Sequence, residues 1–319
     1  MLTTSIGDVA VVRLGLRVPF RGLPAREVLL WRGPLGWAEF APFVEYDDRQ
    51  AVAWLRAMRA AGERTWPVPR RSSVPVNATV PAVPAEQVRD VLALFPGCTT
   101  AKVKVAEASQ TPADDLDRLA AVRDSLGPGG RVRIDANAAW TLDEARRRLP
   151  AYDTAAGGLE YVEQPCADPA DLARLRRAVD VPVAADESIR LGVDPRAAAE
   201  AVDVVIVKVA PLGGVQAALD LACLLDRPVV VSSALDSSVG LAAGVALAAA
   251  LPDLPYACGL GTAALLADDV TDNPLVPHAG SLAVRPVEVS EQRLVDLAVP
   301  ADRARWWVDR LERVVAAAA

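Results

Sequence analysis

Short apolar runs alternate with segments of helical periodicity through most of the chain. The runs are AKVKV, RVRID, LEYVE, VPVAAD, VDVVIVK, RPVVVSS and YACGL, and each is followed by a helical pattern. Strands that alternate with helices in this way pair as a parallel sheet. The polar residues that end the first six runs lie 22 to 31 residues apart, from Lys104 to Ser232. This regular spacing predicts a closed (β/α)8 barrel.

An open, doubly wound sheet is the alternative fold for such a pattern. That fold normally carries a glycine-rich phosphate-binding turn after its first strand. The chain contains no GxGxxG motif. The closed barrel is therefore favoured.

The first part of the chain predicts a small α+β unit. VAVVRLGLRV and VLLWRGPLGWAEF predict strands with a turn at Gly33-Pro34, and DDRQAVAWLRAMRAA predicts a helix capped by Asp47 or Asp48. Prolines and the RRSS stretch then indicate a linker. Near the end, SLAVRPVEV predicts a strand, and the amphipathic RARWWVDRLERVV predicts a helix that returns to cover the first unit. We therefore expect one domain of residues 1–73 plus about 282–319, and a barrel of residues 74–281.

Composition and charge exclude several classes of protein. With 319 residues and 52% hydrophobic content, the chain can bury a large core. Asp plus Glu (41) outnumber Lys plus Arg (34), so no nucleic-acid partner is expected. The longest apolar run, Val239 to Leu251, is shorter than the ~20 residues of a membrane helix, and no signal sequence is recognisable. We expect a cytoplasmic protein without a membrane partner, whose four widely spaced cysteines are reduced, buried thiols.

Five consecutive apolar runs end in a charged residue, although strands buried on both faces are normally apolar. These residues are Lys104, Asp135, Glu163, Asp186 and Lys208. The carboxyl ends of barrel strands open onto one face, where active sites lie, so the five charges should converge there. Side chains alternate along a strand, which places Lys102 on the same side as Lys104. Lys208, four strands further on, should face Lys104 across the barrel.

The three carboxylates predict a metal site. Asp135, Glu163 and Asp186 supply the hard oxygen ligands that Mg²⁺ prefers, with Mn²⁺ as an alternative ion, and leave room for a small carboxylate substrate. Lysine has an unperturbed pKa of about 10.4, but a second lysine and a nearby metal ion both disfavour its charged form. Lys102 is therefore a candidate activator of a basic Lys104.

Each of these residues taken alone has a simpler interpretation. The lysines and carboxylates would form buried ion pairs in an inert barrel mouth. Asp135 and Asp186 each precede a helix, as N-caps do, and Glu163 would be a solvated rim residue. Five suitable charges on five successive strands nevertheless favour the catalytic interpretation.

Six segments together resemble the motif series of the enolase superfamily, in its muconate-lactonizing-enzyme-like subgroup. They are AKVKVAE, RIDANAAW, VEQPC, AADES, VKVAPLGG and SSALDSSVG. The resemblance spans nearly the whole chain and implies an α/β fold, a modified (β/α)8 TIM barrel with an α+β capping domain built from both chain ends. The PFRG and APFVEYDD stretches are most similar to the o-succinylbenzoate synthases of this subgroup.

The resemblance also implies roles for individual residues. Lys104 matches the acid/base lysine, Lys102 its partner and Lys208 the lysine on the opposite face, while the three carboxylates match the magnesium ligands. Three further residues are implied as supporting groups: Asn137 and Glu187 resemble residues near the metal, and Arg133 matches an arginine found in o-succinylbenzoate synthases. Three others are expected to bind substrate, namely Ser232, Gly259 and Arg21.

The implied reaction is that of a lyase, the magnesium-dependent syn dehydration of 2-succinyl-6-hydroxy-2,4-cyclohexadiene-1-carboxylate to 2-succinylbenzoate in menaquinone biosynthesis. N-acylamino acid racemization needs the same two lysines, and muconate cycloisomerization is a further relative. CGLGT lacks the paired aspartates of dipeptide epimerases, and the only histidine, His278, lies beyond the barrel strands, unlike the base of mandelate racemases. A Schiff-base aldolase using Lys208 and a non-catalytic barrel are the more distant alternatives.

Overall fold

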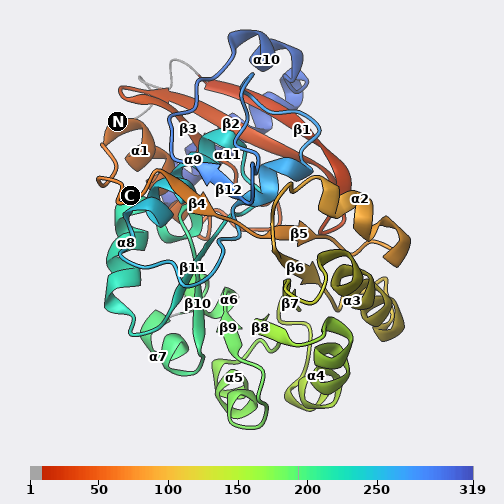
Figure 1. Cartoon of the computed structure of the whole chain (residues 1–319). Coiled ribbons are helices and arrows are strands. Elements are labelled where there is room, and N and C mark those ends of the chain that lie inside the picture. The colour runs from red at the N-terminus through yellow and green to blue at the C-terminus, as the bar shows by residue number, and fades with distance from the viewer. Residues whose placement is uncertain (1–8, 193, 319) are drawn as a thin grey trace.

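The computed structural model describes residues 9–192 and 194–318, which form a curled parallel sheet wrapped by helices and a smaller antiparallel sheet above it (Figure 1). The parallel sheet has seven strands in the order β11-β10-β9-β8-β7-β6-β5. Its strands are β5 (Ala78–Val80), β6 (Thr100–Lys104), β7 (Arg131–Asp135), β8 (Leu159–Glu163), β9 (Val183–Ala185), β10 (Val204–Lys208) and β11 (Val229–Ser232). The order follows the sequence, as expected for a barrel.

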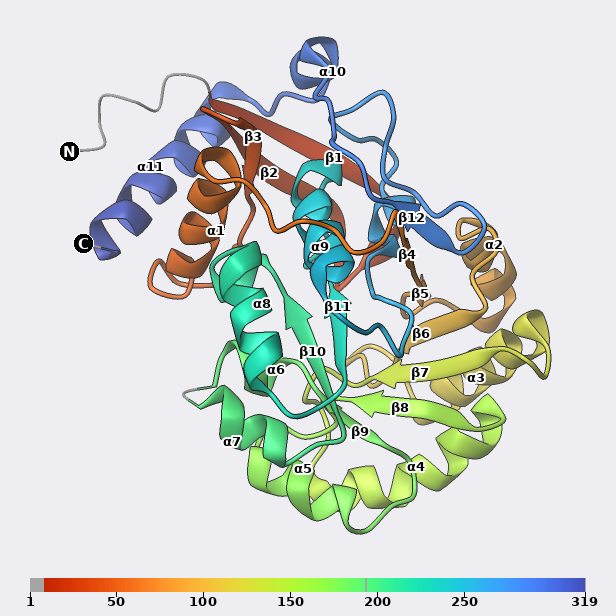
Figure 2. The same ribbon diagram turned by 60° about the vertical axis from the view of Figure 1, so that its left-hand side comes forward.

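Helices cover the outside of this sheet, as Figure 2 shows from a second direction. They are α2 (Val88–Ala93), α3 (Pro112–Leu126), α4 (Leu142–Ala156), α5 (Pro169–Arg176), α6 (Glu187–Arg190), α7 (Pro195–Glu200), α8 (Val215–Leu224) and α9 (Ser238–Ala250). Local sequence explains the starts of the two longest: Thr111 and Thr141 each form a capping box with an acidic residue three positions on. Short 3-10 turns at Ala85–Gln87, Ala210–Leu212 and Gly261–Leu265 complete the connections.

The YACGL run does not form a regular strand, contrary to the sequence prediction. It contributes two isolated parallel bridges, Ser232 with Gly259 and Val76 with Cys258. These bridges connect β11 to the chain just before β5, so the segment closes the barrel with a minimum of backbone pairing. Two glycines in CGLGT explain the absence of a strand, because Gly259 and Gly261 both lie where a Cβ atom would meet neighbouring atoms within 3 Å.

The smaller sheet belongs to a capping unit that combines both parts of the chain. β1 (Val9–Phe20), β2 (Leu23–Gly33) and β3 (Gly36–Phe40) form an antiparallel meander, and α1 (Val52–Glu63) packs on it. The last helix, α11 (Ala301–Ala317), returns to pack against α1 and β1, as its amphipathic pattern predicts. α10 (Glu291–Asp296) precedes it. The proposed domain limits at residues 73 and 282 stay a prediction.

Two local predictions about this unit are wrong. Helix α1 begins at Val52, and neither Asp47 nor Asp48 caps it. Asp47 instead exchanges hydrogen bonds with Gln50 and closes a separate turn before the helix. The expected strand of residues 281–289 is limited to β12 (Ser281–Ala283), which pairs with β4 (Ser73–Pro75), because Pro286 and its neighbours leave the ladder.

The long apolar run near residue 240 forms helix α9, which is buried on nearly all sides. It lies between the antiparallel sheet and the barrel strands, where it contacts β3, β11 and β4 (Figure 2). A helix that is apolar all round is stable in such a buried position. Within the described residues, no helix is both long and apolar enough to cross a membrane.

The thiols differ from the expectation at two positions. All four cysteines are free, and Cys166 and Cys258 are buried, but Cys98 is half-buried and Cys223 on helix α8 is exposed. The prediction of four buried thiols is therefore wrong at Cys223 and met only in part at Cys98.

We predict that Trp307→Ala lowers the free energy of unfolding by ~3–5 kcal/mol, since the indole is fully buried and its ring nitrogen donates to Glu27. Urea denaturation followed by circular dichroism measures the change. Trp306→Ala removes a half-buried neighbour on the same helix and serves as the control. A loss no larger than that of the control would contradict a shared core between α11 and the sheet.

Candidate active site

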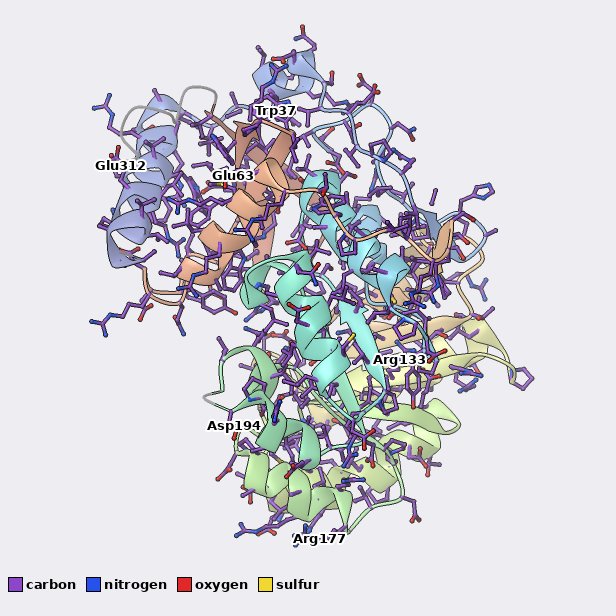
Figure 3. All side chains as sticks on the ribbon, turned by 90° about the vertical axis from the view of Figure 1, so that its left-hand side faces the viewer. Trp37, Glu63, Arg133, Arg177, Asp194 and Glu312 are labelled. Carbon is purple, nitrogen blue, oxygen red and sulfur yellow. The ribbon has the colours of Figure 1, made fainter. Side chains whose placement is uncertain are left out.

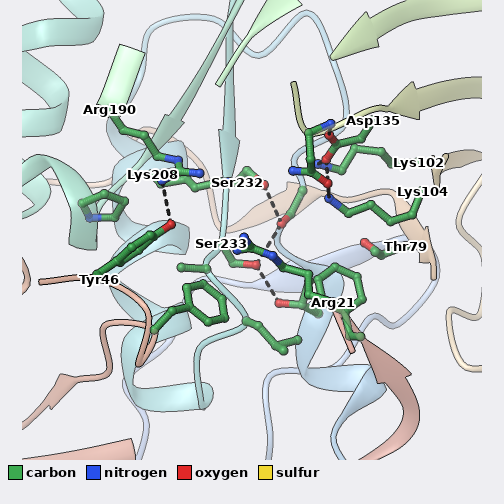
Figure 4. A pocket seen from close by; sticks show the side chains of 18 of the residues that line it. Arg21, Tyr46, Thr79, Lys102, Lys104, Asp135, Arg190, Lys208, Ser232 and Ser233 are labelled. Atoms are coloured by element: carbon green, nitrogen blue, oxygen red, sulfur yellow. Dashed lines mark hydrogen bonds and ion pairs between the residues drawn. The ribbon is translucent and has the colours of Figure 1, made fainter. Parts of the chain in front are cut away.

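The charged ends of five successive strands do meet at one mouth of the barrel. A cavity there is lined by residues from β6, β7, β10 and β11 and, on its other side, by residues of the capping unit. Figure 4 shows Lys102 and Lys104 on one wall and Lys208 on the opposite wall. Glu163 and Asp186 are almost fully buried just behind this lining.

Lys102 and Lys104 share one carboxylate. The Nζ atom of Lys104 lies 2.6 Å from Asp135 Oδ2, and that of Lys102 lies 3.2 Å from the same oxygen. Lys102 also donates to both oxygens of Glu163, at 2.8 and 2.9 Å. Burial opposes the charge of Lys102, but Glu163 and Asp135 together raise its pKa above the ordinary value. Lys102 therefore stays protonated and balances the charge of Glu163. Its role as an activator of Lys104 stays a prediction.

Asp186 lies on the other side of the mouth, directly after β9. Its Oδ2 accepts a hydrogen bond from Lys208 at 2.6 Å, and its Oδ1 accepts one from Arg190 Nε at 3.1 Å. Its side chain makes no capping bond to helix α6. Burial opposes ionisation, yet Lys208 and Arg190 hold the pKa of this carboxyl below its usual range. Asp186 thus occupies the N-cap position of helix α6, as the simpler interpretation expects, but its carboxylate pairs with Lys208 and Arg190 instead of capping the helix.

The simpler interpretations of Asp135 as a helix cap and of Glu163 as a rim residue are wrong. The helix after Asp135 is capped by Thr141, six residues further on. Glu163 has no exposed surface, which excludes a solvated rim position. All three carboxylates are part of the ion-pair network, so their pairing alone would also suit an inert barrel.

Two of the three supporting residues lie beside this network. Asn137 Oδ1 accepts a hydrogen bond from Lys104 Nζ at 2.6 Å, and Asn137 Nδ2 donates to Glu187 Oε1 at 3.2 Å. Glu187 also accepts from Arg190 at 3.0 Å. Asn137 has a φ of 45°, a left-handed conformation that asparagine tolerates better than most residues.

Arg133 lies elsewhere. It points into the barrel interior below the mouth, where Nε contacts Glu160 at 2.5 Å and Nη1 donates to the Ala257 carbonyl at 2.7 Å. Its guanidinium lies 4.7 Å from the Tyr161 ring centre. Figure 3 places Arg133 at the barrel strands, and it is not among the residues that line the cavity. Arg133 makes no hydrogen bond to the three strand-end carboxylates, and its supporting role stays a prediction.

The capping unit supplies the roof of the cavity. Arg21, Phe20 and the loop of residues 42–46 line it from above. Arg21 lies 3.8 Å from Glu45 and 4.6 Å from the Phe43 ring centre, and Figure 4 shows its side chain reaching over the serines of the wall. The 42–46 loop is held by buried Arg310 of helix α11, whose Nη2 donates to the carbonyls of residues 43 and 46. Both parts of the chain thus build the roof.

Ser232 and Gly259 meet at the end of β11. Ser232 Oγ donates to the Gly259 carbonyl at 3.3 Å, and a Cβ on Gly259 would approach that hydroxyl to 2.5 Å. Two hydroxyls that the sequence analysis did not single out, Ser233 and Thr262, lie 2.7 Å apart on the same wall. This wall therefore offers hydroxyl groups and backbone amides rather than charge.

Three other groups in the cavity were also missed. Arg190 donates to the Tyr46 hydroxyl at 2.9 Å and so ties the roof to Asp186. Tyr46 lies within the APFVEYDD stretch, and Arg190 follows the DES motif by a helical turn, so both were adjacent to recognised segments. Thr79 at the end of β5 lines the same cavity but belongs to a run without any charged ending.

The distribution of lysine along the sequence was a stronger indication of the site. Lysine occurs at only three positions of the chain, and the other 31 of the 34 Lys and Arg residues are arginine. The three lysines are Lys102, Lys104 and Lys208, and all of them line this cavity. Arginine cannot be deprotonated under ordinary conditions, whereas lysine can. All the lysine amines of the chain therefore lie at this one site.

The donor set fits Mg²⁺ by its chemistry. Asp135, Glu163 and Asp186 are buried carboxylates at the ends of three adjacent strands. Burial and the charges of Asp135 and Asp186, against the opposing effect of Lys102, raise the pKa of Glu163 to about 7. Such crowded carboxylates are relieved by added positive charge, which the lysines supply in this structure. No group of three acidic, histidine or cysteine side chains within the described residues has its donor atoms gathered as in a bound metal site.

Comparison with known families agrees with this architecture. Residues 85–287 match the family model described as Enolase C-terminal domain-like, and residues 11–62 match the model described as Enolase N-terminal domain-like. Muconate lactonizing enzyme from Pseudomonas fluorescens, solved with muconolactone, superposes with a TM-score of 0.78 at 18% identity, covering 92% of this chain and 98% of that one. The chain therefore belongs to the enolase superfamily and has its capped, modified barrel fold.

More similar relatives narrow the assignment. An o-succinylbenzoate synthase of Thermobifida fusca is 58% identical over 91% of both chains. Another, from Mycolicibacterium smegmatis, is 54% identical over 94% of this chain and 93% of its own. Within the superfamily, the chain belongs to the o-succinylbenzoate synthase family, whose members are lyases.

We predict that Lys102→Met lowers the free energy of unfolding by ~3–5 kcal/mol, because Glu163 has no other hydrogen-bond donor among the described residues. Thermal and urea unfolding of metal-free protein measure the change. The double variant Lys102→Met/Glu163→Gln removes the stranded charge and should recover most of the loss. If the losses of unfolding free energy from the two substitutions simply added up in the double variant, the pairing of Lys102 with Glu163 would be contradicted.

Proposed function

We propose that the protein catalyses the syn dehydration of 2-succinyl-6-hydroxy-2,4-cyclohexadiene-1-carboxylate to 2-succinylbenzoate with Mg²⁺ as its cofactor. The observation that carries this proposal is the placement of Lys104 and Lys208 on opposite walls of one cavity, each beside a buried carboxylate. Membership in a family of lyases supports it further. A place in menaquinone biosynthesis and a cytoplasmic location form part of the proposal.

Lys104 acts as the base and then as the acid. Its amine removes the proton from the carbon next to the substrate carboxylate and returns that proton to the departing hydroxyl on the same face. Asp135 and Asn137 fix the Nζ atom from two sides, and the Phe20 ring lies 5.5 Å away. One base therefore serves both steps, because a syn elimination keeps both groups on one face.

Asp135, Glu163 and Asp186 would hold the metal ion. Mg²⁺ bound there would supply positive charge to the substrate carboxylate, which favours loss of the neighbouring proton. Lys102 holds Glu163 in place by an ion pair, and Arg190 holds Asp186 in the same way. Asn137 and Glu187 in turn hold Lys104 and Arg190. These neighbours orient the carboxylates rather than touch the substrate.

Lys208 has a different task in a dehydration. On the far face of the ring it transfers no proton, and its ammonium group stabilises the delocalised negative charge and the ring by cation–π attraction. The second substrate carboxylate, on the succinyl chain, would be received by Ser232 and the backbone at Gly259, with Arg21 above them. All three line the cavity.

N-acylamino acid racemization is the second candidate, favoured by the same pair of opposed lysines. It requires proton transfer on both faces of one carbon, so both lysines would act as bases. Exchange of the α-proton of an N-succinylamino acid in deuterated water would reveal it. If racemization were the main activity, substitution of Lys104 and of Lys208 would lower the rate to a comparable extent. In the dehydration, Lys104 alone transfers protons.

We predict that Lys104→Ala lowers the dehydration rate by at least ~10²-fold, on the usual scale for a general base, while metal binding persists. The fall in ultraviolet absorbance of the cyclohexadiene substrate measures the rate, and calorimetric titration measures Mg²⁺ binding. Arg131→Ala changes an exposed cation at the far end of β7 and should leave the rate unchanged. Near-normal turnover by Lys104→Ala would exclude it as the base.

The substrate itself is tested with the unaltered protein, first with Mg²⁺ and then with excess chelator. Rapid aromatization that the chelator abolishes and Mg²⁺ restores is the expected result. Lack of turnover with intact Mg²⁺ binding would move the function toward racemization or cycloisomerization.

A further inference from the structure

Two charged residues of the capping unit reach into the barrel and contact the loop of residues 233–237, between β11 and α9. Arg26 of β2, which is buried, donates from Nε to the Leu235 carbonyl at 3.3 Å and from Nη2 to the Ala41 carbonyl. Glu39 of β3 contacts the same loop where it enters helix α9. The loop is thus held at its middle residue and at its helix end by side chains from another part of the chain.

Glu39 acts as a cap for helix α9. Its Oε2 accepts from the Ser237 amide at 3.1 Å, from the Gly240 amide at 3.2 Å and from the Ser237 hydroxyl. Ser237 already caps the helix through its own hydroxyl, which accepts from the Val239 amide. Amides of the first helical turn otherwise lack partners, and they attract acidic groups. The capping unit therefore completes the helix start that the barrel begins.

The contact between Glu39 and helix α9 leaves little space, and it costs stability. A Cβ atom on Gly240 would lie 2.8 Å from the Glu39 carboxyl carbon, so only glycine leaves room for the carboxyl group. Oε1 of Glu39 is covered and has no hydrogen-bond partner within the described residues. Burial and the adjacent Asp236 raise the pKa of Glu39 to about 8. A covered polar atom without a partner normally costs stability, so stability alone gives no reason for this residue.

The loop that these residues hold forms part of the active-site wall. Ser232, Ser233, Ala234 and Leu235 all line the cavity. Leu235 has a φ of 62°, a conformation that costs a non-glycine residue energy and persists only where the surroundings fix it. The Arg26 bond to its carbonyl and the Asp236 bond to the Ala234 amide are such constraints. Figure 4 shows the side chain of Arg21 close to Ser233.

We propose that Arg26 and Glu39 are positioning residues through which the capping unit sets the shape of the 233–237 loop, and hence the affinity of the wall for the distal carboxylate of the substrate. The identity of that substrate rests on the proposed function, whereas the control of the loop by Glu39 does not. A purely structural contact between two domains is the competing explanation. It would lower stability without a selective effect on substrate binding.

Glu39→Ala, Glu39→Gln and Glu27→Gln distinguish these explanations. Glu27 lies in β2, bonds to Arg303 and Trp307 of helix α11 and has no contact with the loop. Its substitution is therefore a control that changes a half-buried carboxylate of the capping unit without touching the loop. Glu39→Ala should raise KM at least about fivefold, the usual scale of a lost helix cap, with kcat changed much less. Glu39→Gln keeps an acceptor oxygen and should recover most of the KM. Glu27→Gln should leave both constants unchanged.

Hydrogen exchange of the ligand-free proteins gives a readout that needs no substrate. Peptides covering residues 233–241 should exchange faster in Glu39→Ala than in the wild type and Glu27→Gln, because two amides lose their acceptor. Unchanged exchange and KM in Glu39→Ala would overturn the proposal, as would equal effects in Glu27→Gln. If the wild type failed to turn over the substrate, the exchange result would still decide the role of Glu39.

Gly240→Ala provides a second route if Glu39→Ala does not fold. The added methyl group displaces the Glu39 carboxyl group without deleting it, and alanine favours the helix more than glycine does. The same rise in KM and in loop exchange is expected. A Gly240→Ala protein with wild-type KM and exchange would overturn the proposal.

Discussion

Pairing of buried carboxylates with buried cations is the interaction on which the barrel mouth depends. Asp135, Glu163 and Asp186 end three adjacent strands, and each is held by an amine or guanidinium from a neighbouring element. Such pairs contribute little net stability, because removing ions from water costs about as much as their attraction returns. A role in the reaction therefore explains these buried ion pairs better than a contribution to the stability of the fold does. The network keeps the three carboxyl groups paired and oriented. Under the proposed function, a metal ion and an anionic substrate would take over part of the charge balance.

Sequence patterns predicted the parts of the fold that repeat. Each strand from β6 to β11 matches an apolar run, and the charged residues at the ends of β6 to β10 meet as expected, because strand ends in a barrel share one face. Local exceptions escaped prediction. YACGL has the composition of a strand, but its glycines permit only bridges, and Asp47 closes a turn where a helix cap was expected. Composition alone does not distinguish these cases.

Contacts between distant segments were the least predictable part of the site. Arg190 follows a recognised motif, but nothing in its neighbourhood indicates that it meets Tyr46, 144 positions earlier. Arg310 holds the roof loop from the last helix, and Glu39 caps a barrel helix from the first sheet. Arg133 shows the converse: its motif position is adjacent to Asp135, yet alternation along β7 places it one layer deeper in the barrel. Roof and barrel thus depend on each other through side chains that only the fold brings together.

The confinement of lysine to the barrel mouth has a practical consequence for work on this protein. Reagents that modify primary amines have only three lysine side chains to react with, apart from the terminal amino group, and all three line one cavity. Acylation or reductive methylation of the lysines therefore reports on the occupancy of this cavity rather than on general surface accessibility. Isotopically labelled methyl groups on these amines would give a spectrum simple enough to assign directly. Coupling to a solid support through lysine, by contrast, would occur at the barrel mouth and block it.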